Sequence, residues 1–190
     1  MARTESKMIQ LGSRAFDFQL PEPLTGKTIR LDDYQNYQAY VVLFICNHCP
    51  YVIHVHDELL TIGREYQSKN IAFFAISSND VANYPDDAPE KMKERAIQFN
   101  YPFPYLYDES QEVAKAYDAA CTPDIYVYDK NKLLVYRGRI DASRPNSGVP
   151  VTGIDLRNAL DAVLTNQEID PIQYPSLGCN IKWKEETIKN

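Results

Sequence analysis

The stretch Tyr40-Val41-Val42-Leu43-Phe44-Ile45-Cys46-Asn47-His48-Cys49-Pro50 decides the fold. Its first six residues are all apolar, which is typical of a strand that is buried on both faces. Two cysteines follow at once, and Pro50, which has no backbone N–H, belongs in the first turn of a helix. The sequence therefore predicts two thiols at the junction between a buried strand and a helix N-terminus.

Two thiols at such a junction are suited to redox chemistry. The thiolate is the reactive form of cysteine, and the unpaired N–H groups and aligned dipoles of a helix N-terminus stabilise it. We expect Cys46 to be the more exposed, attacking thiolate and Cys49, one turn deeper, to be the resolving thiol. Attack on a disulfide would give a mixed disulfide, which Cys49 then resolves by closing the internal one. A protonated His48 would favour the thiolate and tilt the couple toward oxidation.

Apolar periodicity predicts the elements around this junction. Val52, Val55, Leu59, Ile62 and Tyr66 recur at steps of three and four residues, which indicates a helix that ends at Lys69-Asn70. A second apolar run over 71–76 then predicts a parallel strand. The remaining expected elements are an N-terminal hairpin around 28–31 at one sheet edge, helices over 90–99 and 111–117, hairpin strands over 125–128 and 133–140, and a closing helix over 156–164.

Composition limits the partners. The 190 residues predict one domain over 1–165 and a C-terminal extension over 166–190 that packs on it. A net charge of -6 disfavours nucleic acid or an anionic membrane as a partner. No apolar stretch approaches the roughly 20 residues that span a bilayer, so we expect a cytoplasmic protein. Four cysteines in that reducing compartment indicate redox or metal chemistry rather than structural disulfides.

The arrangement of motifs resembles the thioredoxin fold. The matching features are a Cys-x-x-Cys at a strand end, a βαβ unit, and Thr122-Pro123 before a hairpin and a last helix. Ala15-Phe16-Asp17-Phe18-Gln19-Leu20, Val113-Ala114-Lys115-Ala116-Tyr117 and Tyr136-Arg137-Gly138-Arg139-Ile140-Asp141 resemble the peroxiredoxin-like branch, which includes redoxins, AhpC/TSA-type peroxidases and membrane-tethered reductases. The resemblance covers about residues 10–165 and implies an α/β fold with a central mixed sheet flanked by helices.

The resemblance also implies roles for residues outside the dithiol. Pro123 would be a cis-proline that faces the dithiol and leaves the preceding backbone free to pair with an extended substrate, although a proline can also simply open a strand. Cys121 should come close to Cys46 or Cys49, either as a third redox thiol or as a small buried residue. Cys179, in the apolar tail, could be a resolving or regulatory thiol. His54 and His56 are expected on the helix surface, away from Cys49.

Three functions remain open. The first is a thiol-disulfide oxidoreductase in which Cys46 attacks, Cys49 resolves, His48 tunes the couple to be more oxidising than ordinary thioredoxin, and Pro123 organises the substrate loop. Its substrate would be a protein or small-molecule disulfide or thiol, its recycling reductase is unidentified, and it needs no cofactor or metal.

The second function is a thiol-dependent peroxidase with Cys46 as the peroxidatic cysteine. AhpC/TSA peroxidases carry threonine and proline where this chain has Leu43 and Ala39, and Pro123 falls about where they keep an arginine. Without these groups little polarises a peroxide bond. The third function is zinc or copper(I) binding by Cys46, Cys49 and Cys121 with Cys179 or His48, although the spacing is not that of a structural zinc site.

Overall fold

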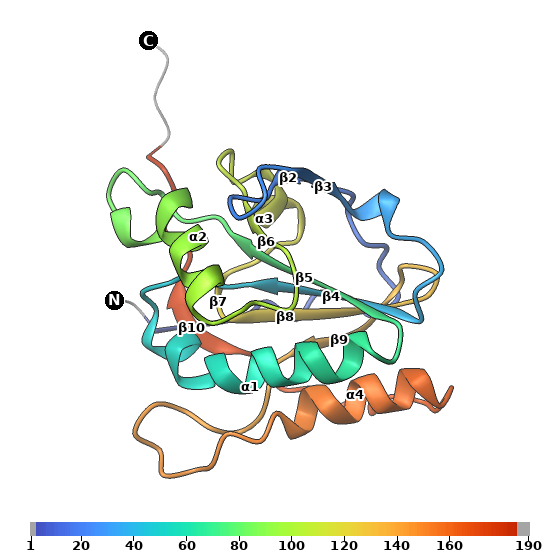
Figure 1. Ribbon diagram of the computed structural model, residues 1–190. Coiled ribbons are helices and arrows are strands. Elements are labelled where there is room, and N and C mark those ends of the chain that lie inside the picture. The colour runs from blue at the N-terminus through green and yellow to red at the C-terminus, as the bar shows by residue number, and fades with distance from the viewer. Residues whose placement is uncertain (1–2, 186–190) are drawn as a thin grey trace.

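A five-stranded mixed sheet forms the centre of the computed structural model, which describes residues 3–185 (Figure 1). Its strand order is β6-β5-β4-β8-β9, and β4, β5 and β6 run parallel while β8 and β9 are antiparallel to their neighbours. The bounds are Ala39–Phe44 for β4, Ile71–Ser77 for β5, Tyr105–Tyr107 for β6, Asp124–Asp129 for β8 and Leu134–Gly138 for β9. This architecture confirms the predicted α/β class.

Two layers cover the sheet. Helices α1 (Pro50–Gln67) and α4 (Ile154–Leu164) lie on one face, and α2 (Pro89–Gln98) adds Met92 to the same core. The five residues of the predicted apolar stripe of α1 are all buried. The opposite face is covered by α3 (Glu112–Ala116) and by the antiparallel hairpin of β2 (Gln19–Pro21) and β3 (Thr28–Arg30).

The sequence predicts that the N-terminal hairpin covers one edge of the sheet. The structure shows that it extends beyond that edge. Strand β2 does contact the edge strand β6, but Phe18, Leu20 and Leu31 pack into the apolar layer over the face opposite α1. The reason is that these three side chains lie just before, within and after the hairpin strands and bury their apolar surface only if the hairpin lies over the sheet.

A second, three-stranded sheet was not predicted. Strand β10 (Leu177–Asn180) lies between β1 (Arg3–Glu5) and β7 (Cys121–Thr122) and is antiparallel to both. Figure 1 shows it at the end of the molecule where α1 begins. The C-terminal segment is therefore built into the region around the predicted dithiol.

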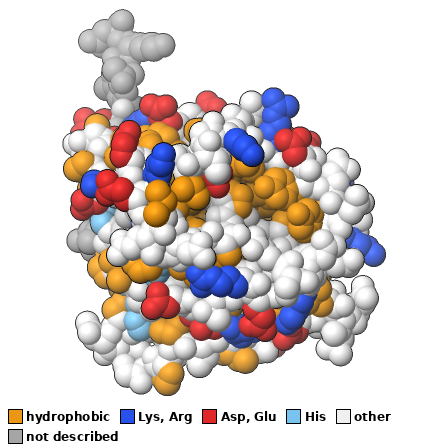
Figure 2. All heavy atoms as spheres, viewed as in Figure 1, with side chains coloured by type: hydrophobic (Ala, Val, Ile, Leu, Met, Phe, Trp, Pro, Cys, Tyr) orange, Lys and Arg blue, Asp and Glu red, His pale blue; other side chains and the backbone are white. Residues whose placement is uncertain are grey.

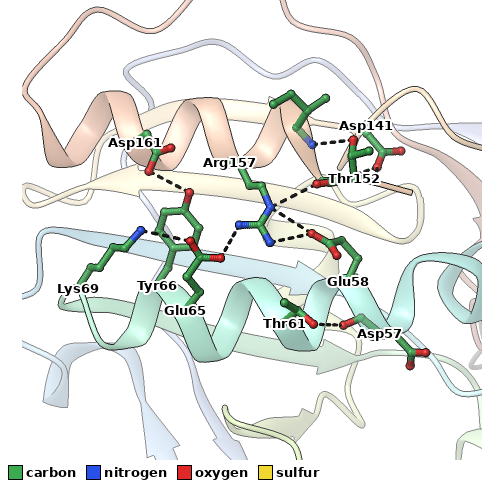
Figure 3. A network of polar contacts seen from close by, with 12 residues as sticks. Asp57, Glu58, Thr61, Glu65, Tyr66, Lys69, Asp141, Thr152, Arg157 and Asp161 are labelled. Carbon is green, nitrogen blue, oxygen red and sulfur yellow. Dashed lines mark hydrogen bonds and ion pairs between the residues drawn. The ribbon is translucent and has the colours of Figure 1, made fainter. Parts of the chain in front are cut away.

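Helix α4 is fixed on α1 by a polar network (Figure 3). Arg157 of α4 pairs with both Glu58 and Glu65 of α1, and the Tyr66 hydroxyl donates to Asp161 at 2.9 Å. Elsewhere, the face drawn in Figure 2 mixes acidic, basic and apolar side chains. Within residues 3–185 no helix is both long and apolar enough to cross a membrane.

Candidate active site

The dithiol lies where the sequence predicted it. Cys46 follows β4, Cys49 is the N-cap residue of α1, and Pro50 occupies its first turn. That first turn carries no acidic residue, so the partial positive charge of the helix N-terminus is not compensated there. The expected difference in exposure is absent, because Cys46 is 1% and Cys49 0% exposed.

Thr122 contacts both sulfurs from the opposite side. Its Oγ1 lies 3.4 Å from Cys46 Sγ, and its carbonyl oxygen accepts the S–H of Cys49 at 3.1 Å. The Thr122-Pro123 peptide bond is cis, as the resemblance implied. The backbone before Pro123 is not free for a substrate, however, because β10 already pairs with it in the register Cys179 opposite Thr122 and Asn180 opposite Cys121.

The pKa values of the two dithiol cysteines are shifted in opposite directions. The hydrogen bond between Cys46 and Cys49, followed by burial, raises the pKa of Cys46. The same hydrogen bond lowers the pKa of Cys49 to about 4, against the opposing effect of burial. The lower pKa of the pair therefore belongs to Cys49, whereas the sequence assigned the attacking thiolate to Cys46.

His48 is paired with an acid that the sequence analysis missed. His48 Nδ1 lies 2.7 Å from Oδ2 of the fully buried Asp87, and this contact raises the pKa of His48. The backbone N–H of Asn47 and the side-chain amide of Asn79 both donate to Asp87 at 2.7 Å. Although burial opposes it, these contacts hold the pKa of Asp87 below its usual value. His48 is therefore half of an ion pair rather than a free cation beside the thiols.

A loop over 84–88 holds this acid against the dithiol. Tyr84 stacks on the His48 ring with 5.5 Å between ring centroids, and the Asn47 side chain donates to the Asp86 carbonyl at 2.8 Å. The carboxyl ends of parallel β4 and β5 meet at one edge of the sheet, so the polar segment after β5 had to lie near the cysteines. That placement was the available signal for Asp87.

The two outlying cysteines lie on opposite sides of the paired strands. Directly opposed residues of an antiparallel pair point to the same side, so Cys179 lies beside Thr122 and joins Cys46 and Cys49 in one buried cluster. Cys121 points the other way and donates its S–H to the Pro123 carbonyl at 3.6 Å. Burial raises the pKa of Cys121. An accessory role for Cys121 stays a prediction, whereas the Cys179 thiol is near enough to Cys49 to lower the pKa of Cys49.

The expected surface position of His56 is wrong. His56 is 4% exposed, its Nε2 lies 3.0 Å from the Tyr101 hydroxyl, and burial lowers its pKa. His54 is half-buried beside a crevice of about 20 Å³ next to Pro123, which is room for about one water molecule. Neither histidine belongs to the cluster of sulfurs.

The same site brings together a set of atoms that could hold a metal ion. One ligand atom each of Cys46, His48 and Asp87 lie within 4.8 Å of one another. This set differs from the four-residue set that the sequence suggested, because Cys121 points away from it. Both carboxylate oxygens of Asp87 already have partners, so an ion bound here would compete with the contact between Asp87 and His48.

Residues 11–137, more than half of the chain, match the family model described as the AhpC/TSA family. The chain belongs to the AhpC/TSA family. A curated relative, the thiol-disulfide oxidoreductase ResA of Geobacillus thermodenitrificans, is 29% identical over 130 residues, which cover 67% of this chain and 68% of the relative.

Solved structures extend the family comparison over nearly the whole chain. An uncharacterized conserved protein from Geobacillus kaustophilus is similar with 52% identity and a TM-score of 0.95, covering 97% of this chain and 98% of its own. A thiol:disulfide interchange protein of the thioredoxin family from Chlorobium tepidum is 14% identical with a TM-score of 0.62, covering 82% of this chain and 99% of its own. The latter likeness shows the thioredoxin fold, as the sequence had suggested.

Proposed function

We propose that this AhpC/TSA family member is a thiol-disulfide oxidoreductase that works through the Cys46–Cys49 dithiol. The observation that carries the proposal is the geometry of two reduced thiols that lie at a helix N-terminus and both contact Thr122. The curated relative named thiol-disulfide oxidoreductase supports the same activity. Protein or small-molecule disulfides are the substrate class that this chemistry fits, and the cytoplasm is the compartment that we propose for it.

The positions of the two cysteines give each of them a role. Cys46 lies in the loop before the helix, next to the half-buried Asn47 and His48, so a substrate that displaces this loop meets Cys46 first. Cys46 attacks the substrate disulfide as its thiolate, and a mixed disulfide forms while one half of the substrate leaves as a thiolate. Cys49 then loses its proton and attacks Cys46 Sγ, which releases the second substrate thiol and closes the internal disulfide. Thr122 Oγ1 hydrogen-bonds Cys46 and lowers its pKa, which favours its thiolate.

Turnover of a protein disulfide such as that of insulin, with dithiothreitol as the reductant, tests the proposal. Cys46→Ser should reduce the rate to that of dithiothreitol alone, whereas Cys49→Ser should accumulate a mixed disulfide on Cys46 that mass spectrometry detects. Cys121→Ser is the matched control, because its thiol faces away from the dithiol, and it should keep the rate of the unaltered protein. Normal turnover by Cys46→Ser would contradict the assigned roles.

Two further readouts separate the remaining functions. Family membership favours a peroxidase as the second candidate, so the same variants should be assayed with hydrogen peroxide, and a peroxide rate well above the disulfide rate would favour that function. The Cys46, His48 and Asp87 cluster favours metal binding as the third. A stoichiometric zinc or copper ion in anaerobically purified protein, lost in Cys46→Ser, would support it.

A further inference from the structure

Strand β10 is a fixed part of the dithiol environment. The backbone N–H of Ile181, just after β10, donates to the Ala120 carbonyl, and that of Lys182 donates to Asn79 Oδ1, at 3.1 and 2.8 Å. On the other side β10 pairs with β1, and Ser6 and Ser176 exchange two hydrogen bonds of 2.8 and 2.9 Å. These contacts set the register that places Cys179 opposite Thr122.

A glycine allows β10 to approach the dithiol this closely. A Cβ at Gly178 would overlap the Thr122 carbonyl oxygen, which is the acceptor of the Cys49 S–H. The next residue, Cys179, points to the side of the strand pair on which Thr122 contacts Cys46. Cys179 is 4% exposed and packs with Cys46 and Cys49 in one core cluster. The thiols of Cys46, Cys49 and Cys179 therefore lie on the same side of the paired strands β7 and β10.

We propose that Cys179 is an internal exchange partner of Cys49, so that the active-site disulfide can move from the Cys46–Cys49 pair to a Cys49–Cys179 pair. This inference rests on the proposed function, which supplies the oxidised Cys46–Cys49 disulfide. The Cys179 thiolate attacks Cys49 Sγ, the Cys46–Cys49 bond breaks, and Cys46 leaves as a thiolate that takes up the proton released by Cys179. The step conserves electrons and needs no further oxidant.

The contacts of the three sulfurs favour this direction of transfer. Burial and the neighbouring Cys49 thiol raise the pKa of Cys179 to about 12 in the reduced protein. In the oxidised protein Cys49 is part of the disulfide and no longer raises the Cys179 pKa as an ionisable neighbour, so that burial, which raises this pKa, is opposed by Lys182, which lowers it. The Thr122 hydroxyl is in place to stabilise the departing Cys46 thiolate.

Oxidised glutathione and peptide mapping test the proposal. In Cys46→Ser, Cys49 should react with glutathione, and Cys179 should then displace it to leave an intramolecular Cys49–Cys179 disulfide. Cys46→Ser combined with Cys179→Ser should instead retain glutathione on Cys49, and Cys46→Ser combined with Cys121→Ser should behave like Cys46→Ser alone. Stable glutathione on Cys49 with a free Cys179 in the single variant would overturn the proposal.

The unaltered protein provides a second measurement that depends on no substitution. After equilibration with oxidised glutathione and an acid quench, the Cys49–Cys179 disulfide should account for at least about one tenth of the oxidised molecules. A smaller share overturns the proposal. If insulin turnover is normal while this disulfide is absent, only the exchange role of Cys179 fails. Failure of both turnover and oxidation would instead remove the proposed function, and the exchange role with it.

Discussion

From its middle to its C-terminal end, helix α1 presents carboxylates to α4, where Arg157 pairs with Glu58 and Glu65 (Figure 3). At its N-terminal end the same helix presents two thiols, and the nearby cation His48 is already paired with Asp87. Charges with fixed partners hold two helices together, whereas at the thiol end the pKa values of the sulfurs depend on the contacts that the thiols make with one another. The comparison separates a structural polar network from a reactive one.

The largest effect is expected from a substitution that displaces strand β10 from the dithiol. Gly178→Ala should destabilise the protein by ~2–4 kcal/mol, because the new Cβ overlaps backbone that cannot move without disturbing the β7 pairing. Urea unfolding measures this loss. Gly148→Ala is the control: nothing lies near its added Cβ, so only its positive φ should contribute, at about 1 kcal/mol. Equal losses in the two variants would contradict the packing described for β10.

Removing the fixed acid at the thiol end should make Cys46 more reactive. Asp87 raises the pKa of Cys46, so Asp87→Asn should increase its alkylation by iodoacetamide at pH 7 by about threefold to tenfold. The pKa of His48 should fall at the same time, because its ion-pair partner is lost. Asp86→Asn is the matched control, since that exposed side chain is not among the groups that contact the dithiol loop. An unchanged alkylation rate in Asp87→Asn would exclude this electrostatic role.

The same variant has a defined pH dependence of stability. The pKa of Asp87 is lowered on folding, so its contribution is present above the unfolded value of 3.8 and is lost as pH falls through the folded value. The pKa of His48 is raised, so its contribution is present below 6.5 and is lost as pH rises through the folded value. The free energy of unfolding that is lost in Asp87→Asn should therefore be greatest between pH 3.8 and pH 6.5. A loss that is constant from pH 3 to pH 9 would contradict the pairing of Asp87 with His48.

A smaller change concerns the hydroxyl that faces Cys46. Thr122→Val keeps the branched shape and the backbone carbonyl but removes the group that lowers the pKa of Cys46. Disulfide exchange at pH 7 should slow by about threefold. This ratio corresponds to about 0.6 kcal/mol, which is at the lower end of the net free energy of one hydrogen bond. Thr122→Ser, which retains the hydroxyl, should keep most of the rate. A rate in Thr122→Val equal to that of the unaltered protein would show that the contact is only steric.

The smallest effect is expected at the other end of α1. Arg157→Lys replaces a fork that holds two carboxylates with a single ammonium and should cost about 1 kcal/mol of stability, because this pair is partly exposed. The alkylation rate of Cys46 should not change. A change in both quantities would mean that the two ends of α1 are coupled and that the separation drawn between them is wrong.

Long apolar runs made the central elements predictable from the sequence. The runs before Cys46 and over 71–76 became β4 and β5 within one residue, and the apolar stripe of α1 is buried as expected. Strand β6 was missed because it has three residues and follows a segment with two prolines. Strands β1, β7 and β10 have two to four residues each, and their pairing joins segments far apart in the chain, which local periodicity does not report.

The site was predictable in its cysteines, His48 and Pro123, but not in Asp87. The positions of Cys46, Cys49 and Pro123 follow from the motif and the resemblance, and the cis peptide bond is confirmed. Asp87 was missed because an acid in a polar loop is usually solvated, and its burial depends on contacts with Asn47 and Asn79 that only the fold creates. The roles of the individual cysteines and the domain boundary at residue 165 stay predictions.

The position of β10 in the chain has a consequence for how the protein is made. During synthesis the dithiol, α1 and β7 leave the ribosome before β10, because chains emerge from the N-terminus. The growing chain therefore exposes Cys46 and Cys49 without their cover for as long as translation of the intervening residues takes. We expect Cys46 and Cys49 to be more sensitive to oxidants in the nascent chain than in the folded protein. This sensitivity should fall once β10 has paired with β7.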